Sequence, residues 1–201
     1  LSAWSLYFRS SIDFWAIFAL PLIVAVLSAL LANADHQSHQ WKSLFAMAFP
    51  RSGIFAGKWA ALMGLNALSA ACFGAANVLT GLAAGMLRPD LGLAFGGLPW
   101  GEAFAAPLLG WLLASGMITI HLWISLRWSS FLVSILSGFL AVVANLFVIG
   151  SFMAANAAYF PWSMPSCVYS ENHLLVLALS AACAGVVYLL ANAQFVRREV
   201  Y

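Results

Sequence analysis

The sequence predicts an all-α integral membrane protein in which residues 1–201 form a single transmembrane domain, a bundle of five membrane-spanning helices. Of the 201 residues, 64% are apolar and only 7% are charged, whereas a soluble domain carries roughly 25% charged residues. So few charged side chains cannot cover the surface of a water-soluble globule. The composition therefore excludes a soluble enzyme, a disordered chain, a coiled coil and a nucleic-acid-binding module.

The charged residues divide the chain into its spans. A membrane-spanning helix needs about 20 apolar residues, and five charge-free stretches are long enough to hold one. We expect these five helices at residues 12–34, 56–86, 104–126, 130–153 and 173–195.

The stretch after residue 128 is long enough for two spans, but its second half contains Pro161 and Pro165. Two prolines and several polar residues argue against a continuous helix there. We therefore expect a broken outer segment over residues 157–171, between the fourth and fifth helices.

The basic residues predict the orientation. With five spans, six of the eight lysines and arginines fall on one side, namely Lys42, Arg51, Lys58, Arg127, Arg197 and Arg198. Cytoplasmic loops carry the excess of basic residues, so the C-terminus is expected in the cytoplasm and Leu1 outside. Because no charged region of a signal peptide precedes the first span, we expect a further span upstream, which gives six in the full-length subunit.

The loop at residues 35–51 is predicted to form a short amphipathic helix that starts near Asp35 and stops at Pro50. One face carries the apolar side chains Trp41, Leu44, Phe45, Ala48 and Phe49. The opposite face carries His36, His39, Gln40 and Ser43. Such a helix lies along the membrane surface, either passively or as a docking element whose aromatic residues fill a groove in a cytoplasmic partner.

The same region carries a recognisable pattern: a span that ends in an acidic residue, then Trp-Lys-x-Leu, then Pro-Arg and a following lysine. The matching residues are Asp35, Trp41, Lys42, Leu44, Pro50, Arg51 and Lys58. This pattern, with Tyr-Phe-Pro-Trp-Ser-Met-Pro at 159–165, resembles the permease subunits of ABC-2 type transporters, above all the lantibiotic-immunity and bacitracin-resistance permeases. The chain departs from that family at Asp35, where Glu is usual, and at Ala48, where Pro is frequent.

The resemblance implies a permease that exports an amphipathic peptide, antibiotic or lipid-like compound across a bacterial inner membrane. Residues 35–51 would be the coupling helix, which sits in a cleft of a separate ABC ATPase that carries ATP and Mg²⁺. Its implied anchors are Trp41, Leu44 and Phe45. The cations Lys42, Arg51 and Lys58 would pair with acids of the ATPase or with anionic lipid headgroups, or serve only as positive-inside anchors.

A second permease subunit, identical or paralogous, and membrane lipid are the other implied partners. No cofactor and no catalytic residue are expected in this chain, which is predicted not to be an enzyme. Gly53–Lys58 resembles a phosphate loop but has three residues between its glycines and Trp59 after the lysine. A true phosphate loop has four residues there and Ser or Thr after the lysine.

Polar residues inside the spans are candidates for a transport path. They are Asn66, Ser69, Asn77, Thr80, His121 and Asn145. Polar groups within a membrane often mark a substrate path, but they also serve as hydrogen bonds between helices. Two further interpretations stay open: a redox or metal subunit that uses His36, His39, His121 or His173, and a scaffold that docks a partner through residues 35–51 without transport. No metal site is predicted, because the His36–His39 pair lacks a third firm ligand.

Overall fold

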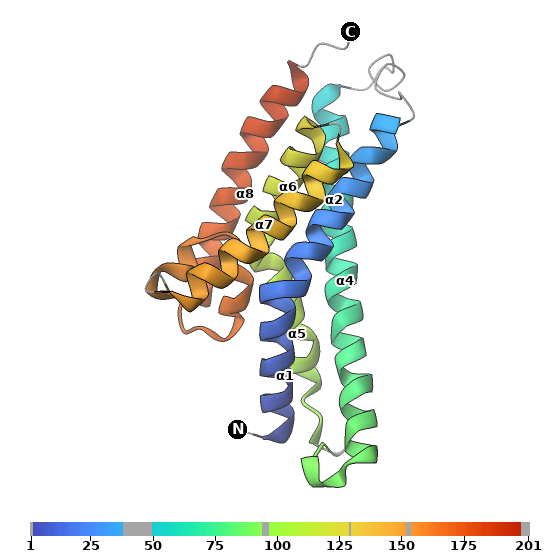
Figure 1. Ribbon diagram of the computed structural model, residues 1–201, viewed down its shortest axis with the longest axis vertical. Coiled ribbons are helices and arrows are strands. Elements are labelled where there is room, and N and C mark those ends of the chain that lie inside the picture. The colour runs from blue at the N-terminus through green and yellow to red at the C-terminus, as the bar shows by residue number, and fades with distance from the viewer. Residues whose placement is uncertain (1, 38–49, 94–96, 129, 152–153, 198–201) are drawn as a thin grey trace.

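The computed structural model describes residues 2–37, 50–93, 97–128, 130–151 and 154–197, and these residues form helices without any strand (Figure 1). Four helices are long and apolar enough to cross a membrane, and a fifth span results if one bent pair of helices counts as a single span. The predicted fold class, an all-α membrane protein, is confirmed.

The first span is a composite helix that begins earlier than residue 12. It consists of α1 (Ala3–Phe14), the π-helix η1 (Trp15–Ala19) and α2 (Leu20–Gln37). Ser2 caps its start, because the Ser2 side chain accepts a hydrogen bond from the Ser5 backbone N–H at 3.1 Å. The start predicted at residue 12 is too late, because Trp4, Phe8 and Ile12 repeat every four residues and bury the preceding turns as well.

Helix α4 (Arg51–Leu87) has 37 residues and is therefore about 55 Å long, well beyond the roughly 30 Å hydrocarbon core of a bilayer. The short helix η2 (Pro89–Leu91) follows it. There the Arg88 guanidinium donates hydrogen bonds of 2.9 and 2.8 Å to the two Asp90 carboxylate oxygens. These bonds favour the ionised carboxylate and lower the pKa of Asp90 from its ordinary value.

The third predicted span, 104–126, is not one straight helix. The structure divides it into α5 (Trp100–Leu113) and α6 (Ser115–Arg127), which meet at an angle of 51°. The break coincides with the sequence Ser115–Gly116, and Gly/Ser pairs are a common cause of helix kinks.

The last third of the chain holds two spans and the segment between them. Helix α7 (Phe131–Gly150) is followed by the 3₁₀ helices η4 (Ala154–Tyr159) and η5 (Met164–Tyr169), and then by α8 (His173–Val196). The segment predicted to be outer, residues 157–171, is thus broken into short pieces around Pro161 and Pro165; it is called the outer segment below after that prediction. Figure 1 shows that α7 and α8 reach only to the level of η4 and η5, whereas α1, α5 and the second half of α4 continue beyond that level.

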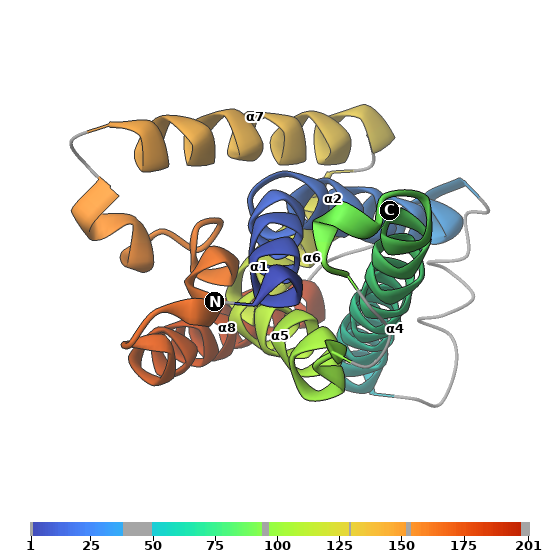
Figure 2. The same ribbon diagram turned by 90° about the horizontal axis from the view of Figure 1, so that it is seen from below.

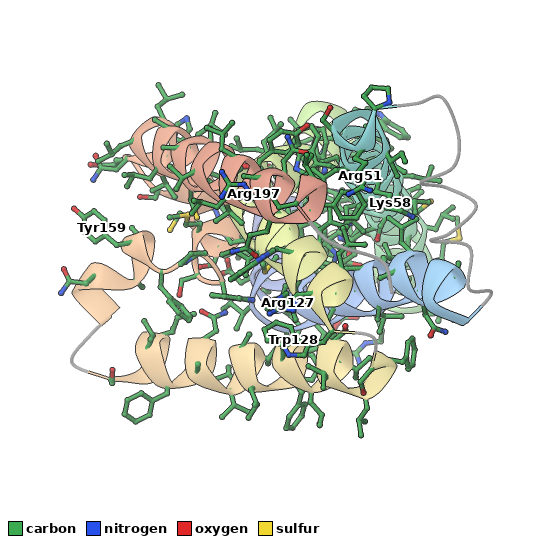
Figure 3. The ribbon with its side chains drawn as sticks, turned by 90° about the horizontal axis from the view of Figure 1, so that it is seen from above. Arg51, Lys58, Arg127, Trp128, Tyr159 and Arg197 are labelled. Carbon is green, nitrogen blue, oxygen red and sulfur yellow. The ribbon has the colours of Figure 1, made fainter. Side chains whose placement is uncertain are left out.

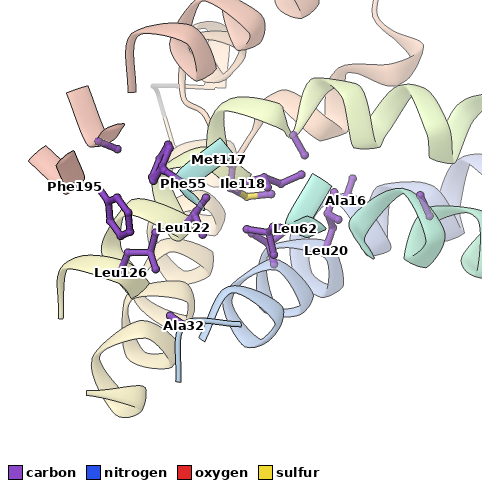
Figure 4. Close-up of a cluster of buried hydrophobic side chains, with 14 of the residues drawn as sticks. Ala16, Leu20, Ala32, Phe55, Leu62, Met117, Ile118, Leu122, Leu126 and Phe195 are labelled. Carbon is purple, nitrogen blue, oxygen red and sulfur yellow. The ribbon is translucent and has the colours of Figure 1, made fainter. Parts of the chain in front are cut away.

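The buried side chains form two clusters, one in each half of the bundle. One cluster surrounds Leu20, Leu62 and Leu122 towards the end where the C-terminus lies (Figure 4). The other surrounds Trp4, Val78 and Val168 in the half that contains α1 and α5. Seen from below, α7 lies along one edge of the bundle beside α2 (Figure 2).

Helix α7 approaches α2 closely because Gly138 has no side chain. A Cβ atom added at Gly138 would overlap the Cβ atom of Ala25. The opposite face of α7 exposes large apolar side chains, including Leu132, Phe139 and Phe147. In a membrane, small residues at a contact let two helices approach closely, and bulky apolar residues suit lipid.

We expect Gly138→Ala to destabilise the protein by about 1–3 kcal/mol, because the added methyl group forces α7 away from α2. Thermal unfolding of the detergent-solubilised protein measures this effect. The matched control is Gly64→Ala, since a Cβ atom at Gly64 meets nothing within 4 Å. Equal unfolding temperatures for the two variants would contradict the close α2–α7 contact.

Candidate functional site

Basic side chains gather at one end of the bundle. Figure 3 shows Arg51, Lys58, Arg127 and Arg197 around the start of α4 and the ends of α6 and α8. These are the described members of the basic set that the sequence places on one side of the membrane. The described arginines Arg9 and Arg88 lie in α1 and just after α4, towards the other half of the bundle.

The helices that flank the predicted coupling segment, α2 and α4, end and begin at this basic end. Asp35 lies in the last turn of α2, and α4 begins directly after Pro50 (Figure 1). The Pro50 carbonyl accepts the Gly53 backbone N–H at 2.8 Å, so Pro50 is the N-cap of α4. Trp41, Lys42, Leu44 and Phe45 lie outside the described residues.

Arg51 joins two spans at this end. Its Nη1 donates a 3.0 Å hydrogen bond to the carbonyl oxygen of Val196, at the C-terminus of α8. A helix C-terminus carries unpaired carbonyls and a partial negative charge, so a cation is stabilised there. The start of α4 is therefore tied directly to the end of α8.

The four predicted path residues of α4 do not share one environment. Asn66 and Asn77 are buried, Ser69 is half-buried and Thr80 is exposed. Asn66 donates to the Leu62 carbonyl of its own helix at 2.9 Å, and Thr80 lies 2.6 Å from the Tyr7 hydroxyl of α1. The Asn66 carbonyl oxygen and the Asn77 amide nitrogen have no hydrogen-bond partner. A role of these residues in a transport path stays a prediction.

His121 and Asn145 both hold the outer segment against the bundle. His121 is fully buried in α6, and its Nε2 accepts a 3.1 Å hydrogen bond from the Trp162 indole N–H. Because indole is only a donor, Nε2 must be the acceptor, so neutral His121 carries its proton on Nδ1. Asn145 accepts a 2.6 Å hydrogen bond from the hydroxyl of Ser163, the residue after Trp162.

Asn145 also donates a hydrogen bond to a backbone carbonyl of the first span that lacks its usual helical partner. Its amide nitrogen donates to the carbonyl of Ile17 at 3.3 Å, inside the π-helix η1. In a regular α-helix that carbonyl would bond to the N–H four residues on, but this position is Pro21, which has none. Asn145 thus has a structural role in this bundle, and its predicted role in a transport path stays a prediction.

Ser180 stabilises the break between α5 and α6. Its hydroxyl donates to the Leu113 carbonyl at 2.7 Å and accepts the Gly116 backbone N–H at 3.1 Å. Both backbone groups belong to the bend, and Ser180 is completely buried in α8. The sequence argument missed this residue. The available signal was a serine in the apolar first half of the last span.

His121 and His173 have hydrogen-bond partners other than a metal ligand set. Among the residues that the structure describes, no three His, Cys, Asp or Glu side chains come close enough together to hold a metal ion. His121 pairs with Trp162, and the Nδ1 of His173 lies 2.8 Å from the Ser170 carbonyl oxygen.

The fold and its basic end define a multi-pass helical membrane protein. A family model described as ABC-2 family transporter protein matches residues 1–147, and the chain belongs to this family. Members are membrane components of transporters, are not themselves catalytic and generally pair with an ABC ATPase. No curated protein and no solved structure matches the chain.

We expect Ser180→Ala to lower the free energy of unfolding by about 1–3 kcal/mol, because it leaves Leu113 C=O and Gly116 N–H unpaired in an apolar setting. Denaturation in detergent measures the change. Ser137→Ala is the control, since the Ser137 hydroxyl donates to the Ser134 carbonyl of its own helix. A loss no larger than that of the control would refute the role of Ser180 at the break.

A double-mutant cycle tests the His121–Trp162 hydrogen bond. His121→Phe and Trp162→Phe each remove one partner of the hydrogen bond. The double variant should lose less unfolding free energy than the sum of the two single variants, and this coupling energy should be about 0.6 kcal/mol, up to roughly 1.7 kcal/mol. Strictly additive losses would show that the two side chains do not interact.

Proposed function

We propose that the chain is the permease subunit of an ATP-driven ABC-2 exporter, in which a separate ATPase docks on the basic end of the bundle. The observation that carries this proposal is the family match together with the places where α2 ends and α4 begins. Both lie at the end of the bundle where the described basic side chains gather. A docking segment at that place is supported by its amphipathic sequence pattern.

The contacts of the basic end suggest how force on the coupling segment would reach the spans. That segment continues directly into α2 on one side and into α4 on the other. The Arg51 hydrogen bond to Val196 extends the connection to α8. Movement of the segment would therefore act on three spans together, as a two-state shift driven by differential ATP binding to the ATPase.

The other parts of the proposal rest on the resemblance and on the charge distribution. Two permease subunits, identical or paralogous, would pair with the ATPases in a bacterial inner membrane, with the basic end in the cytoplasm. The cargo would be an amphipathic peptide, antibiotic or lipid-like compound, as for the lantibiotic-immunity and bacitracin-resistance permeases. The scarcity of charges within the spans suits such a cargo, but the cargo itself is argued by analogy.

The paired substitution Trp41→Ala and Phe45→Ala tests the docking role. We expect the variant to insert normally but to lose most transport and the stimulation of ATP hydrolysis, because its aromatic anchors no longer fill the groove of the ATPase. The readouts are ATPase activity of the assembled complex and substrate accumulation in cells. Trp100→Ala is the control, since Trp100 is exposed at the start of α5, in the other half of the bundle. Full transport by the paired variant would contradict the proposal.

A further inference from the structure

A cavity of about 360 Å³ opens at the basic end of the bundle, between α4, α6 and α8. Its size lies in the lower part of the range of small-molecule sites, roughly 300–1,000 Å³. Its apolar wall consists of Phe55, Leu126, Ala191 and Phe195. None of these side chains belongs to the predicted coupling segment or transport path, so the cavity has no function in the account above.

The polar rim of the cavity offers hydrogen-bond donors. Arg127 and Arg197 are exposed at the ends of α6 and α8, and neither guanidinium has an ion-pair or hydrogen-bond partner among the described residues. Gln194 adds a further donor. Its Oε1 accepts the Trp123 indole N–H at 2.9 Å, which leaves the two N–H groups of the Gln194 amide for another acceptor.

One electrostatic effect opposes an anion in this position. The cavity lies beside the C-termini of α6 and α8, where helix dipoles place partial negative charge. Part of the negative charge at the end of α8 is compensated, because the Arg51 guanidinium donates a hydrogen bond to the Val196 carbonyl. Two full positive charges on Arg127 and Arg197 outweigh the remaining partial charges, about half an elementary charge for each helix.

The cavity lies at the level where two apolar spans end, which is where a membrane surface is expected. It lies at the ends of two apolar spans, where the chain turns from α6 to α7 and leaves α8. Trp123 lines it, and Trp128 stands exposed immediately after α6. Tryptophans are enriched at the boundary between lipid tails and headgroups.

We propose that this cavity binds an anionic phospholipid of the surrounding leaflet. The headgroup phosphate would take hydrogen bonds from Arg127, Arg197 and the Gln194 amide, and the first carbons of the acyl chains would lie on the apolar wall. A phosphate with attached apolar chains matches both halves of the site, whereas an acidic protein segment matches only the rim. Basic pockets between spans on the cytoplasmic side are typical headgroup sites. The proposal rests on the cytoplasmic orientation of the basic end given under the proposed function.

Native mass spectrometry of the detergent-purified full chain tests this site. The protein is titrated with phosphatidylglycerol, with phosphatidylcholine of the same chains, and with soluble glycerol phosphate. We expect phosphatidylglycerol to be retained preferentially and glycerol phosphate hardly at all, because the latter lacks the acyl chains. The paired variant Arg127→Gln and Arg197→Gln should bind phosphatidylglycerol roughly ten- to thirtyfold more weakly.

Two further variants keep the test decisive. Arg88→Gln removes an exposed arginine outside the basic end and should retain phosphatidylglycerol like the wild type. Arg127→Lys with Arg197→Lys keeps both charges and should retain most of the binding, which excludes simple unfolding as the cause of a loss. Equal retention of both phospholipids, or undiminished binding by the Gln pair, would overturn the proposal.

The same variants separate this site from the ATPase interface. If the Gln pair loses assembly with the ATPase but retains phosphatidylglycerol, the cavity contacts protein and the lipid proposal fails. If lipid retention follows the prediction while no ATPase assembles, the proposed function fails and the lipid site stands.

Discussion

The constraint on which the architecture depends is that every peptide group inside a membrane must find a hydrogen-bond partner within the protein. Among the described residues, two interruptions of helical hydrogen bonding are each bridged by a side chain from another span. Pro21 leaves the Ile17 carbonyl without its helical partner, and Asn145 supplies one. At the bend after Leu113, the Ser180 hydroxyl donates to the Leu113 carbonyl and accepts the Gly116 N–H. Polar contacts thereby hold α7 against the first span and α8 against the third. Apolar packing alone would not determine these pairings, because lipid is as apolar as the helix surfaces.

Both breaks lie near the same level of the bundle as the outer segment. The Trp15 ring, in the π-helix, lies against Gly110, and Val168 of the outer segment lies against the same glycine. Trp162 and Ser163 insert their polar atoms beside them. The two buried clusters meet at this level, where irregular backbone is held by hydrogen bonds between two packed halves.

The distribution of charges and the length of apolar stretches predicted where the helices lie. Features that depend on one contact between distant residues could not be predicted in this way. Charge-free stretches predicted apolar helices, but the first one begins at Ala3 and includes Arg9 and Asp13. Pro161 and Pro165 indicated the interruption that the structure shows between α7 and α8. The bend at Ser115–Gly116 was missed because hydropathy does not register backbone direction. Asn145 and His121 stood out as polar residues in apolar spans, but their partners, a backbone carbonyl and Trp162, are 128 and 41 residues away in sequence. Ser180 was missed because a lone serine in a span also occurs on surfaces without a role.

The central claim is that the chain is the membrane component of a transporter whose ATPase is a separate protein. Its most direct test is purification of the protein from its native host in mild detergent, followed by mass spectrometry of the proteins that accompany it. The account predicts a stoichiometric companion that carries a phosphate-loop motif and an ABC signature. A protein that purifies alone under conditions that preserve membrane complexes, or one with the absorbance of bound haem, would contradict it.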